Sequence, residues 1–218
     1  MMPTVVTIDG PAGTGKSTVA RLVADQLGFQ FLNTGAMYRA VAWQCLQHNI
    51  ELTNRNLVAE VASQLQFSIQ DHQLLVNGKD LLKDSRMEKI GQAASIIASL
   101  PDVRAHLVAH QRSLASQQDI VTEGRDQGTV VFPHATCKIF LTARPEIRAQ
   151  RRYEDLKHQA DISYEQILAE QSERDRRDTT RSVAPLKPAE DAITVDSSDL
   201  EIDEVIARIV SIVQQSLR

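Results

Sequence analysis

A glycine-rich run near the start of the chain limits its fold more than any other feature. Residues 10–17 read Gly-Pro-Ala-Gly-Thr-Gly-Lys-Ser and match the pattern G-x-x-x-x-G-K-[ST] in full. The apolar stretch Val5–Ile8 precedes the run, and the helix-patterned stretch Thr18–Leu27 follows it. This order of strand, loop and helix is the one in which loop N–H groups and a helix N-terminus face a common anion. The run therefore predicts a phosphate-binding loop for a nucleoside triphosphate.

The chemistry of the run is specific at two positions. Lys16 supplies a mobile positive charge for the terminal phosphates, and the Ser17 hydroxyl is placed to ligate a bridging Mg²⁺. A glycine-rich turn without function is the alternative, and the flanking strand and helix disfavour it. The residues expected to hold the triphosphate are Gly10, Pro11, Ala12, Gly13, Thr14, Gly15, Lys16, Ser17 and Thr18.

Composition favours one soluble enzyme domain. The chain has 218 residues and a formal net charge of −4, which argues against a nucleic-acid-binding module and fits a small anionic ligand. Cys45 and Cys137 lie in apolar stretches without CxxC spacing, so buried thiols in a reducing compartment are expected. No apolar run reaches the length of about 18 residues that spans a membrane, and no leader pattern is found. We expect a cytoplasmic monomer.

Strand-like and helix-like segments alternate along the chain, which predicts a parallel sheet covered by helices on both faces. A helix capped by Thr34 is expected to run to about Gln47, after the second strand. The five expected strands are Thr4–Ile8, Gln30–Leu32, Ile120–Glu123, Lys138–Leu141 and Ala192–Val195.

Two segments interrupt this alternation, and a mobile subdomain is expected at each. Residues 49–118 are mostly helical in pattern, clearest at Met87–Leu100 and Val103–Gln117. They also contain two strand-like triplets, Phe67–Ile69 and Leu74–Val76, and the turn dipeptide Asn77-Gly78, which together indicate a small hairpin. Residues 146–181 are charged and helical in pattern, with Ser163 as a candidate helix cap.

Two charged runs outside the loop are candidates for a second binding site. Arg125 and Asp126 follow the expected strand Ile120–Glu123, and ligands of open parallel sheets bind at the carboxyl ends of strands. A solvated turn with a local ion pair is the alternative. In residues 173–181, Arg174, Asp178 and Arg181 share one helix face, and Arg177 lies one turn before Arg181. An exposed, ion-paired surface is the alternative there, but the two prolines of residues 182–188 favour a fixed loop.

Four segments together resemble the bacterial-type cytidylate kinases. They are Gly10–Thr18, Asn33–Arg39, Glu123–Pro133 and Arg181–Pro188, and the resemblance spans essentially the whole chain. It implies an α/β P-loop three-layer sandwich with a five-stranded parallel sheet, a nucleoside monophosphate-binding domain with a small β insertion, and a short helical lid. The implied division of the single domain 1–218 is a core of 1–48, 119–145 and 182–218, a monophosphate-binding part of 49–118, and a lid of 146–181.

The resemblance also implies a reaction: with Mg²⁺, the γ-phosphoryl group of ATP passes to CMP or dCMP. A monophosphate acceptor is already an anion and needs no general base, whereas two phosphates need cancellation of their mutual repulsion. Arginine suits that task because its fork bonds two oxygens and keeps its charge. By resemblance Thr34, Arg39, Arg125 and Arg181 bind the acceptor phosphate; Lys16, Arg125, Arg177 and Arg181 are the expected catalytic cations; and the lid residues Arg151 and Arg152 bind the donor.

Cytosine presents an amino donor beside two acceptors, so its pocket must offer one acceptor and one donor side by side. Asp126 and Arg104 are expected to supply that pair, and UMP is expected to be a poor substrate. The resemblance adds Ser95 at the base, and Asp178 with Arg174 at the ribose. For Ser95 a hydrogen bond within its own helix is the alternative, and for Arg104 an ordinary surface position.

The chain departs from the family pattern at two positions. Asn33 stands where an acidic residue is more usual, which puts in doubt an Mg²⁺ contact through that side chain, and Gln127 stands where an aliphatic residue is typical. Rival functions are another P-loop kinase with UMP, AMP or shikimate as acceptor, a non-catalytic nucleotide-binding scaffold, and a GTP-dependent switch. The switch would need an N-K-x-D run, which the sequence lacks.

Overall fold

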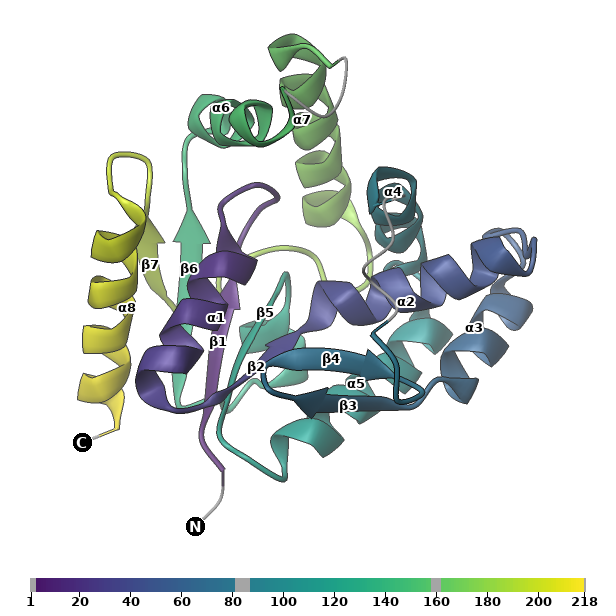
Figure 1. Ribbon diagram of the computed structural model, residues 1–218, viewed down its shortest axis with the longest axis horizontal. Helices are drawn as coiled ribbons and strands as arrows, with labels where there is room; N and C mark the ends of the chain where they lie inside the picture. Colours follow the sequence, from purple (N-terminus) through teal and green to yellow (C-terminus); the bar gives the residue numbers. More distant parts are fainter. Residues whose placement is uncertain (1–2, 81–86, 158–161, 218) are drawn as a thin grey trace.

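A five-stranded parallel sheet forms the centre of the protein (Figure 1). The computed structural model describes residues 3–80, 87–157 and 162–217. The strand order is β2-β5-β1-β6-β7, and every neighbouring pair is parallel. The strands are β1 Val5–Asp9, β2 Gln30–Asn33, β5 Ile120–Gly124, β6 Cys137–Thr142 and β7 Ile193–Asp196. The expected α/β fold class is confirmed, and each strand begins or ends within two residues of its expected bounds.

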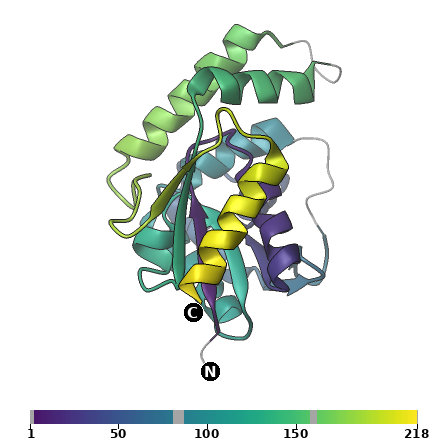
Figure 2. The same cartoon turned by 90° about the vertical axis from the view of Figure 1, so that its left-hand side faces the viewer.

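Helices cover both faces of the sheet because its central strands carry apolar residues on both sides. One face, with Val6 and Ile8 of β1, packs against α1 Lys16–Leu27 and α8 Ile202–Ser216. The other face packs against α2 Thr34–Gln47 and α5 Pro101–Ala115, with Leu32 of β2 and Ile120 of β5 in that core. Figure 2 shows α8 lying along the sheet, with the two helices of residues 145–180 beyond its end. Cys45 and Cys137 are buried free thiols, as expected.

The strand order changes direction at β1, which lies between β5 and β6. The loop after β1 therefore opens into the crevice at the carboxyl ends of the strands, where open parallel sheets bind ligands. Helices α6 Pro145–Leu156 and α7 Tyr164–Thr180 lie over that end of the sheet (Figure 1). Ser163 caps α7 with a reciprocal capping box, as the sequence predicts. No helix within the described ranges is long and apolar enough to cross a membrane.

The segment 49–118 contains the predicted hairpin. Strands β3 Phe67–Gln70 and β4 Gln73–Val76 pair with Gln70 opposite Gln73, so Asp71-His72 makes the two-residue turn. Both residues have positive φ, 48° and 60°, as a type I′ turn requires. The predicted dipeptide Asn77-Gly78 forms the next tight turn, closed by hydrogen bonds between Val76 and Lys79. The helices found in the segment are α3 Arg55–Gln64, α4 Met87–Ile97 and α5. Residues 81–86 of this segment, and residues 158–161 of the segment 146–181, lie outside the described residues.

Two helix ends differ from expectation. Asn33, not Thr34, caps α2: its Oδ1 accepts from the Ala36 N–H at 2.9 Å, because the cap residue must keep extended backbone angles. Helix α7 ends at Thr180, so Arg181 has left the helix with extended backbone and does not share a helical face with Arg174. Arg181 instead reaches the crevice from the chain that follows the helix, held by a bond from its Nε to the Ala184 carbonyl (2.6 Å).

Candidate active site

One cavity of about 1100 Å³ lies at the carboxyl ends of the strands. The glycine-rich loop forms one side, the loop after β5 and the start of α2 form the floor, and α4, α6 and α7 close the remaining sides. The cavity is lined by the following residues predicted from the sequence: Ala12, Gly13, Thr14, Gly15, Lys16, Ser17, Thr18, Thr34, Arg39, Ser95, Arg104, Arg125, Asp126, Arg151, Arg152, Arg174, Arg177, Asp178 and Arg181. Segments far apart in the sequence therefore meet around a single space.

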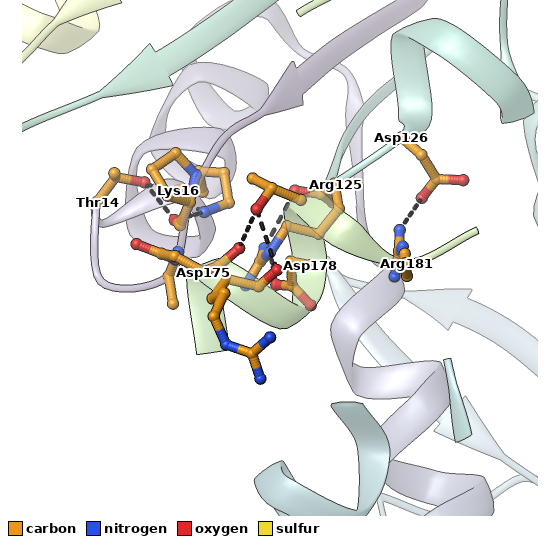
Figure 3. Close-up of polar contacts among 12 residues, drawn as sticks. Thr14, Lys16, Arg125, Asp126, Asp175, Asp178 and Arg181 are labelled. Carbon is orange, nitrogen blue, oxygen red and sulfur yellow. Dashed lines mark hydrogen bonds and ion pairs between the residues drawn. The ribbon is translucent and has the colours of Figure 1, made fainter. Parts of the chain in front are cut away.

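The glycine-rich loop needs glycine for close approach. At Gly10, φ is 154° and a Cβ atom would lie 2.0 Å from the Leu141 carbonyl oxygen of β6. Lys16 is buried, and its ammonium donates to the Pro11 carbonyl and to Thr14 Oγ1 (3.1 Å) (Figure 3). Burial and the charge of Arg125 hold the pKa of Lys16 well below its usual value. A bound polyphosphate would offset both effects.

A carboxylate stands beside the loop's hydroxyl. Ser17 Oγ donates to Glu123 Oε1 at 3.0 Å, at the end of β5. Hydroxyl and carboxylate oxygens are hard ligands of the kind Mg²⁺ takes, usually with several waters and substrate phosphates completing its shell. Among the described residues no cluster of three or more His, Cys, Asp or Glu side chains could hold a metal alone. The pair fits a cation that arrives with a nucleotide.

Facing the loop across the cavity is a group of arginines. Arg125 Nε donates to Asp178 Oδ2 at 2.8 Å. Burial lowers the pKa of Arg125, but the charges of Asp178 and Glu123, together with the hydrogen bond to Asp178, raise it by more, and the net result is a rise. The others contrast with it: within the described part of the chain, nitrogen atoms of Arg39, Arg174, Arg177 and Arg181 are buried without a hydrogen-bond partner. Burial lowers the pKa of Arg39 and Arg181, and that of Arg174 to about 10, where the charge of Arg125 adds to the effect. Buried cations with free donors suit an anionic ligand.

Arg104 and Asp126 form a buried ion pair at one end of the cavity. Arg104 Nη1 also donates to the Tyr38 hydroxyl at 3.2 Å, and Arg181 Nη2 lies 3.7 Å from Asp126 Oδ1 (Figure 3). The alternative of a surface arginine is therefore wrong for Arg104. Ser95 Oγ is buried and makes no hydrogen bond to any described residue, so the alternative of a bond within its own helix is not found. Asp126, Arg104 and Ser95 all line the same cavity.

Two predicted donor-side arginines have different surroundings. Arg151 donates to the Ser197 carbonyl at 2.6 Å and to its Oγ at 3.2 Å, which ties α6 to the chain after β7. Arg152 is more exposed and lines the cavity. Thr34 Oγ1 donates to the Glu123 carbonyl at 2.6 Å, beside the loop that carries Arg125 and Asp126. Their roles toward nucleotides stay predictions.

Sequence reasoning missed four charged residues around the site: Asp9, Glu123, Arg148 and Asp175. The buried Asp9 carboxylate accepts from the N–H groups of Gln127 (2.9 Å) and Gly128 (2.7 Å), and so ties β1 to the loop that carries Arg125 and Asp126. Burial raises its pKa to about 7. Asp9 and Glu123 could have been found, because each stands at the carboxyl end of a predicted strand.

The two departures from the family pattern both have local partners. Asn33 caps α2, and its side-chain amide oxygen accepts a hydrogen bond from the Ala36 N–H. Gln127 directly follows Arg125 and Asp126 and is buried. Its Oε1 accepts from Thr122 Oγ1 at 3.1 Å, and its Nε2 donates to Gln111 Oε1 at 3.4 Å. Neither side chain takes the place of a predicted ligand.

Comparison with known proteins gives a consistent result. The family model "Cytidylate kinase" matches residues 6–215. Curated relatives named "Cytidylate kinase" include one from Aeromonas salmonicida (strain A449), 45% identical over 99% of this chain and 96% of its own. Another, from Pseudomonas syringae pv. tomato, is 47% identical over 95% and 93%.

Solved structures with the same fold are more distant in sequence. A gluconokinase from Sinorhizobium meliloti 1021 superposes with a TM-score of 0.53 at 15% identity, covering 98% of this chain and 93% of its own. A shikimate kinase from Bacteroides thetaiotaomicron gives 0.51 at 10% identity, covering 97% and 98%. At such identities the likeness shows the P-loop kinase fold alone.

Proposed function

This chain belongs to the cytidylate kinase family, and we propose that it transfers the γ-phosphoryl group of ATP to CMP or dCMP by Mg²⁺-assisted in-line displacement. The products are ADP and CDP or dCDP. In this proposal the glycine-rich loop binds the donor, and Arg39, Arg125 and Arg181 bind the acceptor phosphate.

One observation carries the proposal: two cationic phosphate sites face each other across one cavity, with no residue needed as a proton acceptor. Lys16 lies on one side. On the other lie Arg39, Arg174, Arg177 and Arg181, each with a buried guanidinium nitrogen that makes no hydrogen bond to any described residue. An acceptor that is itself a phosphate anion can attack without losing a proton, and it requires this positive charge.

The steps follow from these charges. Arg39, Arg125 and Arg181 hold the acceptor phosphate in line with the donor, because paired guanidinium donors fix both position and orientation. Lys16 leaves the Pro11 carbonyl and Thr14 to follow the transferred group. Ser17 and Glu123 would hold Mg²⁺, which when bound neutralises charge on the donor phosphates. Preorganised charge in a water-poor space is then the main source of rate.

Base selection is proposed for the other end of the cavity. Asp126 accepts from the cytosine amino group, while Arg104 and Ser95 serve its acceptors, and Asp178 with Arg174 contacts the ribose. Uracil would place a carbonyl against the Asp126 carboxylate, a mismatch that costs on the order of 100-fold in rate. We further propose that 49–118 is the acceptor domain and 146–181 the lid, which close over both nucleotides and exclude water.

The proposal is tested by ADP release, measured in a coupled assay with ATP and Mg²⁺ across CMP, dCMP, UMP, AMP and shikimate. CMP or dCMP should turn over fastest, and UMP on the order of 100-fold more slowly. Lys16→Met, which removes the loop's charge, is the inactive control. An enzyme that forms no CDP, or that prefers shikimate, would refute the proposal.

A further inference from the structure

Helices α6 and α7 both contact the glycine-rich loop at a single residue, Ala12. Asp175 of α7 accepts from the Ala12 N–H at 3.0 Å (Oδ1), and Arg148 of α6 donates to the Ala12 carbonyl at 2.7 Å (Nη1). The two side chains also pair with each other, with Arg148 Nη1 2.6 Å from Asp175 Oδ2. We call this set of contacts the Ala12 clasp. It satisfies the backbone N–H and the carbonyl of the same residue at once.

The clasp is buried and well supported. The Arg148 side chain is 6% exposed and that of Asp175 is 18% exposed. Arg148 Nε also donates to the Ala143 carbonyl at 3.1 Å, which fixes the plane of the guanidinium. Gln171, one helical turn before Asp175, fills the space over Gly13, where a Cβ atom would lie 2.6 Å from its Nε2. The clasp therefore fixes the positions of α6 and α7 relative to the glycine-rich loop.

Helix α7 also contacts Arg125, one of the arginines proposed to bind the acceptor, less than one turn after Asp175. Asp178 of α7, three residues after Asp175, holds Arg125 at 2.8 Å, and Arg174 lines the same cavity. Figure 3 shows Asp175 beside the loop that carries Thr14 and Lys16, and Asp178 beside Arg125. Three residues of α-helix rise about 4.5 Å, a spacing that side-chain motion cannot change. Helix α7 thus connects the donor loop to the acceptor arginines rigidly.

The clasp differs from the phosphate-binding cations in one respect. Arg148 has three hydrogen-bond partners in the structure, whereas Arg39 Nε, Arg174 Nε and Arg181 Nη2 make no hydrogen bond to any described residue. Protein atoms already accept from Nε and Nη1 of Arg148, so these donors need no phosphate. A buried ion pair adds little net stability after desolvation, and geometric specificity is one attested reason for keeping such a pair.

We propose that Arg148 and Asp175 are positioning residues: the Ala12 clasp fixes the distance between donor loop and acceptor arginines, and so controls the rate of transfer rather than the affinity for either nucleotide. This inference rests on the proposed kinase function. Each nucleotide keeps its own binding residues when the clasp is lost, but the two phosphates are no longer held at reacting distance. A misplacement of about 1 Å is enough to cost on the order of 100-fold in rate.

The test compares Asp175→Asn, Arg148→Met and the double variant with wild type. Asp175→Asn keeps the size and the bond to Ala12 but removes the ion pair. Dissociation constants for ATP and for CMP are measured separately by calorimetry, kcat by the coupled assay, and Tm by calorimetric unfolding. Arg176→Met is the matched control, because it removes an exposed pair with Glu173 from the same helix.

The clasp predicts that kcat falls about 10–100-fold in each single variant while both dissociation constants stay within about threefold. The double variant should be no slower than the slower single variant, since the two residues act as one unit. Arg148→Lys, which keeps the charge but not the fork, should lose kcat in the same direction by a smaller factor. The Arg176→Met control should retain the wild-type kcat.

Two results would overturn the inference: variants with lowered Tm but wild-type kcat per binding-competent molecule, or losses that multiply in the double variant. Binding stoichiometry from the calorimetric titrations corrects kcat for any unfolded fraction. A wild-type protein that forms no CDP would refute the proposed function itself. Normal turnover by wild type together with normal turnover by all clasp variants would refute only the clasp.

Discussion

Arg174 allows a prediction in which stability and activity change in opposite directions. Its guanidinium is mostly buried beside Arg125, Arg39 and Arg177, with Asp178 as the favourable charge, and its pKa is lowered from the usual arginine value to about 10. At ~1.4 kcal/mol for each pH unit, that difference corresponds to about 3 kcal/mol of unfavourable burial at neutral pH. Because the residue retains some solvent contact, we take about 2 kcal/mol as the recoverable part.

Arg174→Met removes this charge and keeps a side chain of similar reach. Without nucleotide, the variant should be more stable than wild type by about 2 kcal/mol, or ~4–8 °C in Tm for a chain of this size. Its kcat/KM for CMP should fall about 10–100-fold, because a charged hydrogen bond to the acceptor is lost. Differential scanning calorimetry with and without CMP, and the coupled assay, measure the two quantities.

The exposed control Arg176→Met should change stability by no more than about 0.5 kcal/mol. Adding saturating CMP should raise the Tm of wild type more than that of Arg174→Met, since binding stabilises only in proportion to affinity. An Arg174→Met protein with a lower Tm than wild type in the absence of nucleotide would refute the argument that burial of the Arg174 charge destabilises the fold. Unchanged kcat/KM for CMP would remove Arg174 from the acceptor site.

Three further outcomes are expected. Arg181→Ala should lower kcat about 100-fold or more with a small change in Tm, and near-normal turnover would exclude it from the site. Asp126→Asn should lower kcat/KM for CMP about 10–100-fold and for UMP by less, so an unchanged CMP-to-UMP ratio would contradict its role at the base. Asp9 has a folded pKa of about 7 against 3.8, so the native state favours its protonated form; that contribution is complete below pH 3.8 and lost as pH rises to about 7. The free energy of unfolding of wild type, minus that of Asp9→Asn, should therefore fall as the pH rises from 3.8 to about 7. Chemical denaturation at several pH values measures this difference, and a difference that does not change with pH would refute the argument.

Local sequence patterns were sufficient to predict most of the fold. Apolar runs such as Val5–Ile8, and the cap at Ser163, are signals contained in a few consecutive residues, and both elements form where expected. The two strands of the hairpin and the turn at Asn77-Gly78 were predicted, but the turn at Asp71-His72 was not, because that dipeptide lacks glycine and only the strand register, with Phe67 opposite Val76, places a turn there. The pattern of a single segment cannot report that register.

The candidate site was predictable where one short run carries the chemistry, as in residues 10–17 and at Arg125-Asp126. Contacts between distant segments were not: Asp175 meets Ala12 across 163 residues, and Ser17 meets Glu123 across 106. On a helix as charged as α7, nothing local separates Asp175 from its exposed neighbours. Only the packing of α6 and α7 over the loop identifies it.

The internal bonds of Lys16 affect how the donor site discriminates between ligands. Its ammonium already rests on two uncharged oxygens, those of Pro11 and Thr14, so an incoming molecule must offer better acceptors than the protein itself provides. Neutral solutes and weak acceptors offer too little to draw the side chain away. A chain of phosphates offers several charged oxygens in place of these two neutral ones, so the bonds of Lys16 to its own loop would favour polyphosphates over weaker anions at the proposed donor site.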